Sequence, residues 1–136
     1  MFSDFMALWA AYRHSREEWS PKEALLGRDR RIFHRVTSRV SCRMTSRLFG
    51  LESAGTAINL SLGGAGVLAP VTWPEGSQIR FVLDEYKFDV GGIICFRVDS
   101  DQQFRYGIKF DKITMSELQR LRKILRERYK GPLAIL

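Results

Sequence analysis

The prediction of the fold rests on one stretch of ten residues, Val36-Thr37-Ser38-Arg39-Val40-Ser41-Cys42-Arg43-Met44-Thr45. Its even positions are mostly apolar, whereas its odd positions are all polar or charged. Successive side chains of a strand point to opposite faces, so a period of two is typical of a strand with one face in water. The stretch therefore predicts a β-strand whose other face belongs to a core.

Similar patterns predict further strands over residues 57–60, 67–69, 78–83, 88–98 and 104–110. We expect Gly63, Gly64 and Gly66 to interrupt the strand pattern, and Gly91-Gly92 to mark a bulge or bend in the longest strand. Several short strands with one flanking helix indicate a small antiparallel barrel, because closure removes exposed strand edges.

A helix is predicted at the C-terminal end of the chain. It begins at the capping box Thr114-Met115-Ser116-Glu117 and ends at Gly131-Pro132. Its expected buried stripe consists of Leu118, Leu121 and Leu125.

The N-terminal region predicts two helices that precede the strands. The first runs from Ser3 to about His14, and we expect its apolar stripe to pack on the domain or on a second copy of the chain. That stripe consists of Phe2, Phe5, Met6, Trp9 and Tyr12. A helix that binds a membrane surface or a partner is the alternative. A capping box at Ser20 predicts a second, short helix that ends before Gly27. The chain thus divides into an N-terminal helical extension, 1–26, and a barrel domain with a C-terminal helix, 27–136.

Composition limits the kind of partner. The 136 residues suffice for one domain and an extension, and the formal net charge of +7 favours an anionic partner such as a nucleic acid, a nucleotide or an acidic surface. Cys42 and Cys95 fit no disulfide or metal-binding spacing, so buried thiols are expected. No apolar run reaches the ~18 residues that a membrane span needs, and no signal peptide is evident, which predicts a cytoplasmic protein.

Two motifs frame the first strand and its neighbour. One is the basic cluster Asp29-Arg30-Arg31-Ile32-Phe33-His34-Arg35, and the other is the turn Asn59-Leu60-Ser61-Leu62-Gly63-Gly64. Arginine forks pair with the O6/N7 edge of guanine or with phosphates, and they stack on purines. In the turn, an amide oxygen and a hydroxyl can bind a base or phosphate, and Gly64 permits close backbone approach or positive φ. A solvated basic loop and a plain strand-end bend are the alternatives. Together the motifs predict an anion-and-purine site formed by Arg30, Arg31, Arg35, Asn59, Ser61 and Gly64.

From about Gly27 to Tyr129 the chain resembles the PilZ domain family, a bacterial receptor module for cyclic di-GMP. Arg31 and Arg35 match the family's RxxxR motif, and the turn matches its [D/N]xSxxG motif with Asn in place of the commoner Asp. The strand 106–110 and the terminal helix match the family's closing pattern. The resemblance implies a mainly β protein with a six-stranded antiparallel barrel. It also implies that the ligand lies across the outer surface under the RxxxR loop. Some family members carry an aromatic near Phe96 that stacks on guanine, and packing of Phe96 in the core is the alternative.

The resemblance implies a non-enzymatic second-messenger receptor that binds cyclic di-GMP, as one copy or a stacked dimer. Binding would change its conformation and so regulate a partner in motility, biofilm or exopolysaccharide output. Expected partners are cyclic di-GMP and a protein or second copy at the N-terminal helices. One alternative is a PilZ-fold interaction module with weak or no ligand binding. Another is a basic nucleic-acid-binding barrel, which is disfavoured because the strands lack a row of exposed aromatics among basic residues. No nucleophile–His–acid set, metal cluster or phosphate-loop lysine favours an enzyme, and no cofactor or metal is expected.

Overall fold

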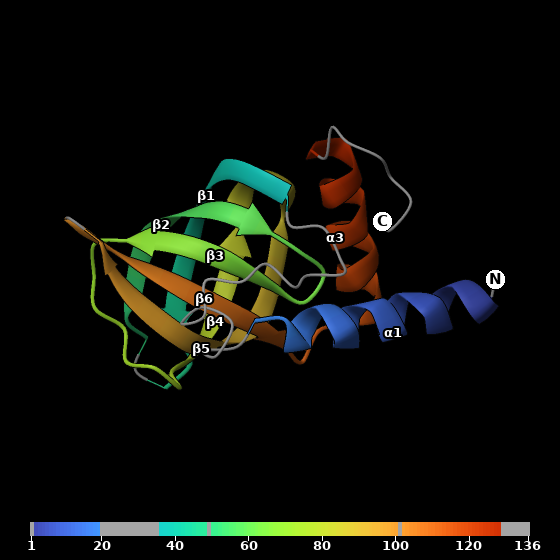
Figure 1. The fold of residues 1–136 in the computed structure, drawn as a ribbon, viewed down its shortest axis with the longest axis horizontal. Coiled ribbons are helices and arrows are strands. Elements are labelled where there is room, and N and C mark those ends of the chain that lie inside the picture. The colour runs from blue at the N-terminus through green and yellow to red at the C-terminus, as the bar shows by residue number, and fades with distance from the viewer. Residues whose placement is uncertain (1, 20–35, 49, 101, 129–136) are drawn as a thin grey trace.

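The computed structural model describes residues 2–19, 36–48, 50–100 and 102–128. Two α-helices, six strands and a short 3₁₀ helix lie within these ranges (Figure 1). In chain order the elements are α1 (Phe2–Glu17), β1 (Val36–Ser46), β2 (Glu52–Leu60), β3 (Gly64–Ala69), β4 (Gln78–Leu83), η1 (Asp84–Tyr86), β5 (Phe88–Ser100), β6 (Gln103–Asp111) and α3 (Met115–Arg128).

The six strands form a closed antiparallel barrel, as predicted. Their order around the barrel is β1-β2-β3-β6-β5-β4, and β4 pairs back with β1. The first two strands pair from Val36 opposite Leu60, and the closing pair places Arg43 opposite Val82. Closure gives the strands partners on both sides, which removes the edges at which an open sheet would aggregate.

The barrel encloses an aromatic core. In β4, Ile79, Phe81 and Leu83 are buried and alternate with more exposed neighbours, as a period of two requires. The ring of Phe110 lies 5.5 Å from that of Phe81 and 5.9 Å from that of Phe88. Each aromatic pair of this kind adds about 0.5–1.5 kcal/mol beyond the burial of its area. These rings therefore fix how β4, β5 and β6 meet inside the barrel.

Helix α3 begins at the predicted capping box. Thr114 Oγ1 accepts a hydrogen bond from the Glu117 backbone N at 3.1 Å, and Glu117 Oε1 accepts one from the Thr114 backbone N at 3.1 Å. The predicted stripe of Leu118, Leu121 and Leu125 is buried together with Ile124. These side chains join the barrel core beside one end of the barrel, where α3 stands in Figure 1.

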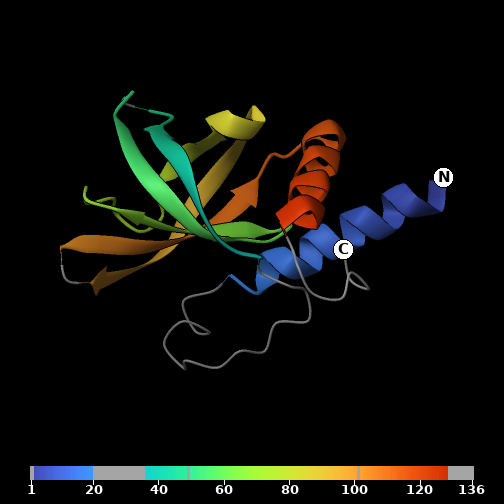
Figure 2. The ribbon, with the colours of Figure 1, turned by 90° about the horizontal axis from the view of Figure 1, so that it is seen from above.

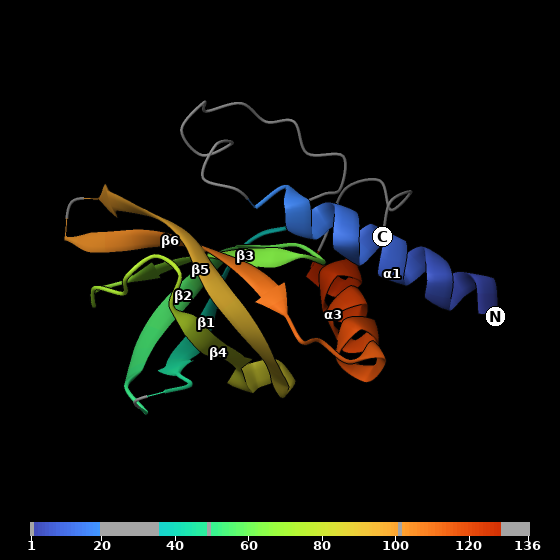
Figure 3. The same ribbon diagram turned by 90° about the horizontal axis from the view of Figure 1, so that it is seen from below.

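Helix α1 differs from the prediction in its length and its buried face. It continues to Glu17, about one turn beyond the expected end. Of the expected stripe, Tyr12 is buried and Trp9 packs against the core, whereas Phe5 and Met6 are 43% and 60% exposed, so the prediction is confirmed at the first two residues and wrong at the last two. Leu8, which was not predicted, is also buried. The C-terminal part of α1 lies against the barrel near β3, and its N-terminal part extends past α3 (Figures 2 and 3). The helix therefore packs on the domain through its second half.

Two further predictions concern the helices. The short helix expected before Gly27 lies outside the described residues. None of the helices within the described ranges has the length and apolarity to cross a membrane.

The glycine-containing strands also differ from the prediction. β2 begins at Glu52, five positions early, and β3 begins at Gly64, so Gly64 and Gly66 continue the strand pattern, whereas Gly63 interrupts it in the turn as expected. The irregularity in β5 lies between Ile94 and Phe96, not at the expected glycines. Gly92 is in regular register, and a Cβ there would come within 2.7 Å of Ile108 Cγ2. These glycines serve close packing, which a reading of strand propensity cannot detect.

The buried hydroxyl of Tyr106 gives a test of the barrel fold. It donates to the Val71 carbonyl at 2.6 Å and accepts from the Trp73 backbone N at 2.7 Å. We expect Tyr106→Phe to lower the free energy of unfolding by about 1–3 kcal/mol, because both partners lose a hydrogen bond. Urea denaturation measures this change. Tyr86→Phe is the control. Among the described residues, its hydroxyl accepts a single hydrogen bond, from Arg128 at the surface of α3. Equal effects of the two variants would contradict the assignment.

Candidate functional site

The predicted turn between β2 and β3 forms, but it is not open to solvent. The Ser61 backbone N donates to the Gly64 carbonyl at 2.9 Å, which closes the turn. Ser61 is only 1% exposed. Gly64 has no positive φ. It allows close approach instead, because a Cβ would lie 2.3 Å from the Ile108 carbonyl oxygen and 2.7 Å from the Trp19 ring. The turn thus brings Asn59, Ser61 and Gly64 together and buries the hydroxyl among them.

The end of α1 covers this turn. Ser61 Oγ accepts hydrogen bonds from the Trp19 indole Nε1–H at 2.7 Å and from Ser15 Oγ at 3.0 Å. It also donates to the Gly64 carbonyl at 3.4 Å. A serine hydroxyl has one donor and two acceptor positions, so these contacts use its whole hydrogen-bonding capacity. Ser15 Oγ in turn accepts from the Gly63 backbone N at 2.9 Å.

A second set of contacts joins α1 to the end of β6. The Phe110 carbonyl accepts from Tyr12 OH at 2.8 Å and from Arg16 Nε at 2.7 Å. Burial raises the pKa of Tyr12, although the nearby Arg16 charge opposes this, so the hydroxyl stays protonated as a donor. Gly63 lies directly beneath the helix backbone, where a Cβ would be 2.0 Å from the Arg16 N atom. α1 is therefore held by both polar contacts and backbone fit.

Three glycines give the outer face of the barrel a strip without side chains, which we call the glycine shelf. It consists of Gly64 and Gly66 in β3 and Gly107 in β6, and Gly66 pairs with Gly107 in register. Their strand neighbours Ala65, Tyr106 and Ile108 point into the core, so the shelf faces outward. Such a strip allows a flat group to approach the backbone closely.

Three side chains lie over the glycine shelf. The Trp19 ring lies on Gly64, the Asn59 side chain on Gly66 and the Phe96 ring on Gly107, each so close that a Cβ on the glycine would collide with it. Phe96 is 8% exposed yet lies outside the core cluster, so its ring belongs to the outer face and not to the barrel interior. Asn59 Oδ1 is buried and has no hydrogen-bond partner in the described part of the chain. A buried acceptor without a partner is rare and is suited to receive a ligand's N–H.

The structure does not describe Arg30, Arg31 or Arg35, which lie outside its described ranges. β1 nevertheless begins at Val36, directly after Arg35, and Val36 pairs with Leu60 between Asn59 and Ser61. Adjacent Cα atoms are about 3.8 Å apart, and a chain extends at most ~3.6 Å per residue. Chain connectivity alone therefore keeps the Cα of Arg35 about 3.8 Å from that of Val36, and the Cα of Arg31 within ~18 Å of it.

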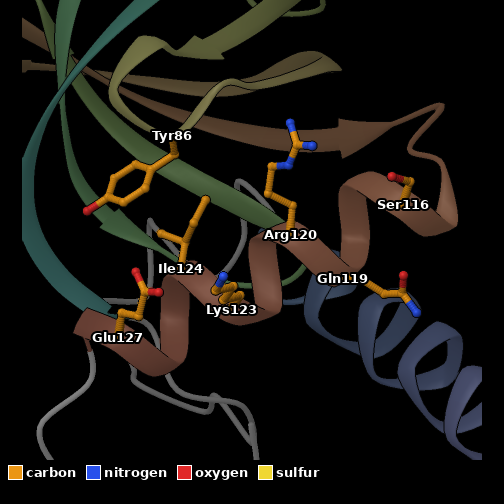
Figure 4. Close-up of a pocket in the computed structure, with 7 residues that line it drawn as sticks. All are labelled: Tyr86, Ser116, Gln119, Arg120, Lys123, Ile124 and Glu127. Carbon is orange, nitrogen blue, oxygen red and sulfur yellow. The ribbon is translucent and has the colours of Figure 1, made fainter.

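Other polar features of the structure do not contribute to this site. A shallow groove of about 440 Å³ lies between η1 and α3, and none of the three predicted ligand residues that the structure describes, Asn59, Ser61 and Gly64, lines it (Figure 4). Its lining consists of Tyr86, Ser116, Gln119, Arg120, Lys123, Ile124 and Glu127. No group of three metal-binding side chains is found over the described ranges. Cys42 is buried, and burial raises the pKa of its thiol to about 12, whereas Cys95 is half-buried.

Comparisons with known proteins identify the family. The model of the PilZ domain matches residues 29–127, and this chain therefore belongs to the PilZ domain family. No curated protein matches the sequence.

Solved structures share the fold at low identity. The PilZ domain of YcgR from Escherichia coli with c-di-GMP is 19% identical, with 74% of this chain and 92% of that chain covered and a TM-score of 0.59. The MrkH–c-di-GMP complex of K. pneumonia is 15% identical, covering 74% of this chain and 52% of that one, with a TM-score of 0.62. The inhibitor of motility MotI/DgrA of Bacillus subtilis is 14% identical, covering 75% and 55%, with a TM-score of 0.57. This chain thus spans about half the length of MrkH and MotI.

Sequence reasoning missed part of this site. Ser15 and Trp19 reach the turn from more than 40 positions away in the sequence, and no local pattern signals such a contact. The shelf had a weak signal, because Gly64, Gly66 and Gly107 stand where strand residues would otherwise carry side chains.

The fit of α1 over Gly63 gives a test of the docked helix. In Gly63→Ala, the new methyl would collide with the helix backbone at Arg16, so we expect α1 to leave the barrel while the strands stay folded. Backbone amides of α1 should then exchange with solvent at least ~10-fold faster, with no change in β4 or β5. Gly50→Ala is the control for a general loss of stability, because its φ of +66° disfavours alanine while a Cβ there meets nothing within 4 Å; it should destabilise the fold without selectively releasing α1. Unchanged exchange in α1 of Gly63→Ala would contradict this packing.

Proposed function

We propose that this chain is a non-enzymatic receptor for cyclic di-GMP that uses the RxxxR and NxSxxG motifs. The observation that carries the proposal is the register of β1 and β2, in which Val36, the residue that follows the arginine motif, pairs with Leu60 of the NxSxxG motif beside the glycine shelf. Membership of the PilZ family supports it, as do structures of YcgR and MrkH that hold c-di-GMP on the same fold. The proposed ligand residues are Arg30, Arg31, Arg35, Asn59, Ser61 and Gly64.

The chemistry of the ligand matches the site. Cyclic di-GMP carries two phosphates and two guanines, and arginine can pair with either group or stack on the base. Asn59 Oδ1, buried without a described partner, offers an acceptor for a guanine N–H. Gly64 would let a flat base approach β3 once Trp19 leaves it, and the Phe96 ring would border that base over Gly107. Because Asn59 is uncharged, its bond is weaker than the charge-assisted bond that Asp would form.

The proposed output is a conformational change. Contacts that form only in the ligand-bound state supply the free energy for it, since a ligand shifts an equilibrium only by its differential affinity. We propose that the N-terminal helices present a changed surface to a protein partner or a second copy of the chain. The regulated process would be motility, biofilm formation or exopolysaccharide production in the bacterial cytoplasm.

The second candidate is a PilZ-fold interaction module that binds ligand weakly or not at all. The burial of Ser61 beneath α1 favours it, because a serine with every hydrogen bond satisfied can be purely structural. A nucleic-acid-binding barrel has only the net charge of +7 in its favour.

Titration of the full-length protein with cyclic di-GMP by calorimetry distinguishes these functions. We expect wild type to bind, excess GTP not to compete, and Arg31→Ala to bind about 10- to 100-fold more weakly, since charge-assisted hydrogen bonds are lost. The ratio of ligand to protein shows whether one copy or a stacked pair binds. Binding to a nucleic-acid polymer would instead weaken steeply with salt through counterion release.

Arg39→Ala is the matched control for this titration. It removes the same charge from an exposed position on β1, four residues beyond Arg35, and should leave the affinity unchanged. If wild type gives neither heat nor a thermal shift with cyclic di-GMP, the receptor function is wrong. If Arg39→Ala weakens binding as much as Arg31→Ala, general charge and not the motif accounts for binding.

A further inference from the structure

We propose that α1 is a built-in competitor of the ligand, in which the Trp19 indole occupies the place of a guanine base over Gly64. This inference rests on the proposed function, because it assumes that cyclic di-GMP uses the NxSxxG turn. The ligand then binds only when Trp19 and Ser15 release Ser61. Release of the end of α1 is the conformational change that follows binding.

Access to Ser61 supports the competition. The residue is 1% exposed, and its hydroxyl is bonded by Ser15 of α1 and by Trp19, two residues beyond the end of α1. These two donors fill both of its acceptor positions, at 2.7 Å for Trp19 and 3.0 Å for Ser15. A ligand N–H can therefore donate to this oxygen only by replacing the hydrogen bond from Trp19 or the one from Ser15.

The chemistry of the indole supports its assignment as a base mimic. Indole is a flat, fused two-ring heterocycle with a ring N–H, as guanine is. In this structure the N–H donates to Ser61 Oγ, and the ring lies so close to Gly64 that a Cβ would come within 2.7 Å of it. Trp19 is buried, with 1% exposure, yet it does not belong to the core cluster. Its ring therefore lies on the outer face of the barrel at Gly64, where the ligand is proposed to bind.

The strength of α1 docking suits a reversible competitor. The helix is held at Ser61 and Gly63 by three hydrogen bonds and at the Phe110 carbonyl by two more. Each is a net stabiliser of only modest size because water replaces it on release. A ligand whose binding-competent state is populated only in part binds with an affinity reduced by that fraction. Loss of one of these bonds should therefore raise the apparent affinity.

Trp19→Phe tests the competition in the full-length protein, with cyclic di-GMP as the titrant. The change removes the indole N–H and keeps an aromatic ring, so we expect cyclic di-GMP to bind about 2- to 10-fold more tightly than to wild type. Ser15→Ala removes the other donor to Ser61 and should change the affinity in the same direction. Thermal unfolding of each variant establishes that it is folded before titration.

Trp73→Phe is the matched control. The Trp73 indole N–H donates to Ser53 Oγ at 2.9 Å, so the change removes the same kind of buried bond away from α1. We expect it to lower stability without changing the affinity for cyclic di-GMP.

Each outcome decides between the two proposals. If wild type binds and Trp19→Phe binds equally, the competition is overturned and the receptor function stands. Weaker binding by Trp19→Phe would also overturn it, because Trp19 would then be a ligand contact. If neither wild type nor Trp19→Phe nor Ser15→Ala binds, the receptor function itself fails. Binding by Trp19→Phe alone would support the competition, but it would overturn the receptor function of the wild-type chain.

Discussion

The buried hydroxyl of Ser61 is the contact on which the arrangement of this chain depends. It belongs to the turn that joins β2 to β3, and it accepts hydrogen bonds from two side chains at the end of α1. Burying a hydroxyl without partners is unfavourable, so separation of the helix from the turn would cost the Ser61 hydroxyl its hydrogen bonds to Ser15 and Trp19. The barrel and its N-terminal extension are thereby coupled at the one turn that carries the family's motif.

The glycines around Ser61 make this coupling possible. Gly63 lies beneath the α1 backbone, and Gly64 lies beneath the Trp19 ring. Side chains at these positions would hold the helix away from the barrel. The same absence of a side chain leaves Gly64 uncovered once Trp19 is released, whereas Asn59 and Phe96 still lie over Gly66 and Gly107 and border the uncovered backbone. One set of residues thus suits both a docked helix and a planar ligand.

The sequence predicted the parts of the fold that local patterns determine. Alternation in β4 and the capping box at Thr114 involve neighbours in the chain, and both predictions are confirmed. The strand over 67–69 was predicted, but its start at Gly64 was missed because glycine disfavours strands on average, and glycine is there because Trp19 approaches closely. The motif residues of the turn were identified by resemblance. The burial of Ser61 was not, since its partners lie 42 and 46 positions away in the sequence.

The indole N–H resonance of Trp19, followed by NMR during addition of cyclic di-GMP, tests the central claim most directly. Trp73 provides an internal reference, because its indole donates to Ser53 and not to the turn. The account predicts that the Trp19 signal shifts and exchanges faster with solvent as ligand binds, while the Trp73 signal stays unchanged. A Trp19 signal that remains in place at saturating ligand would contradict the account.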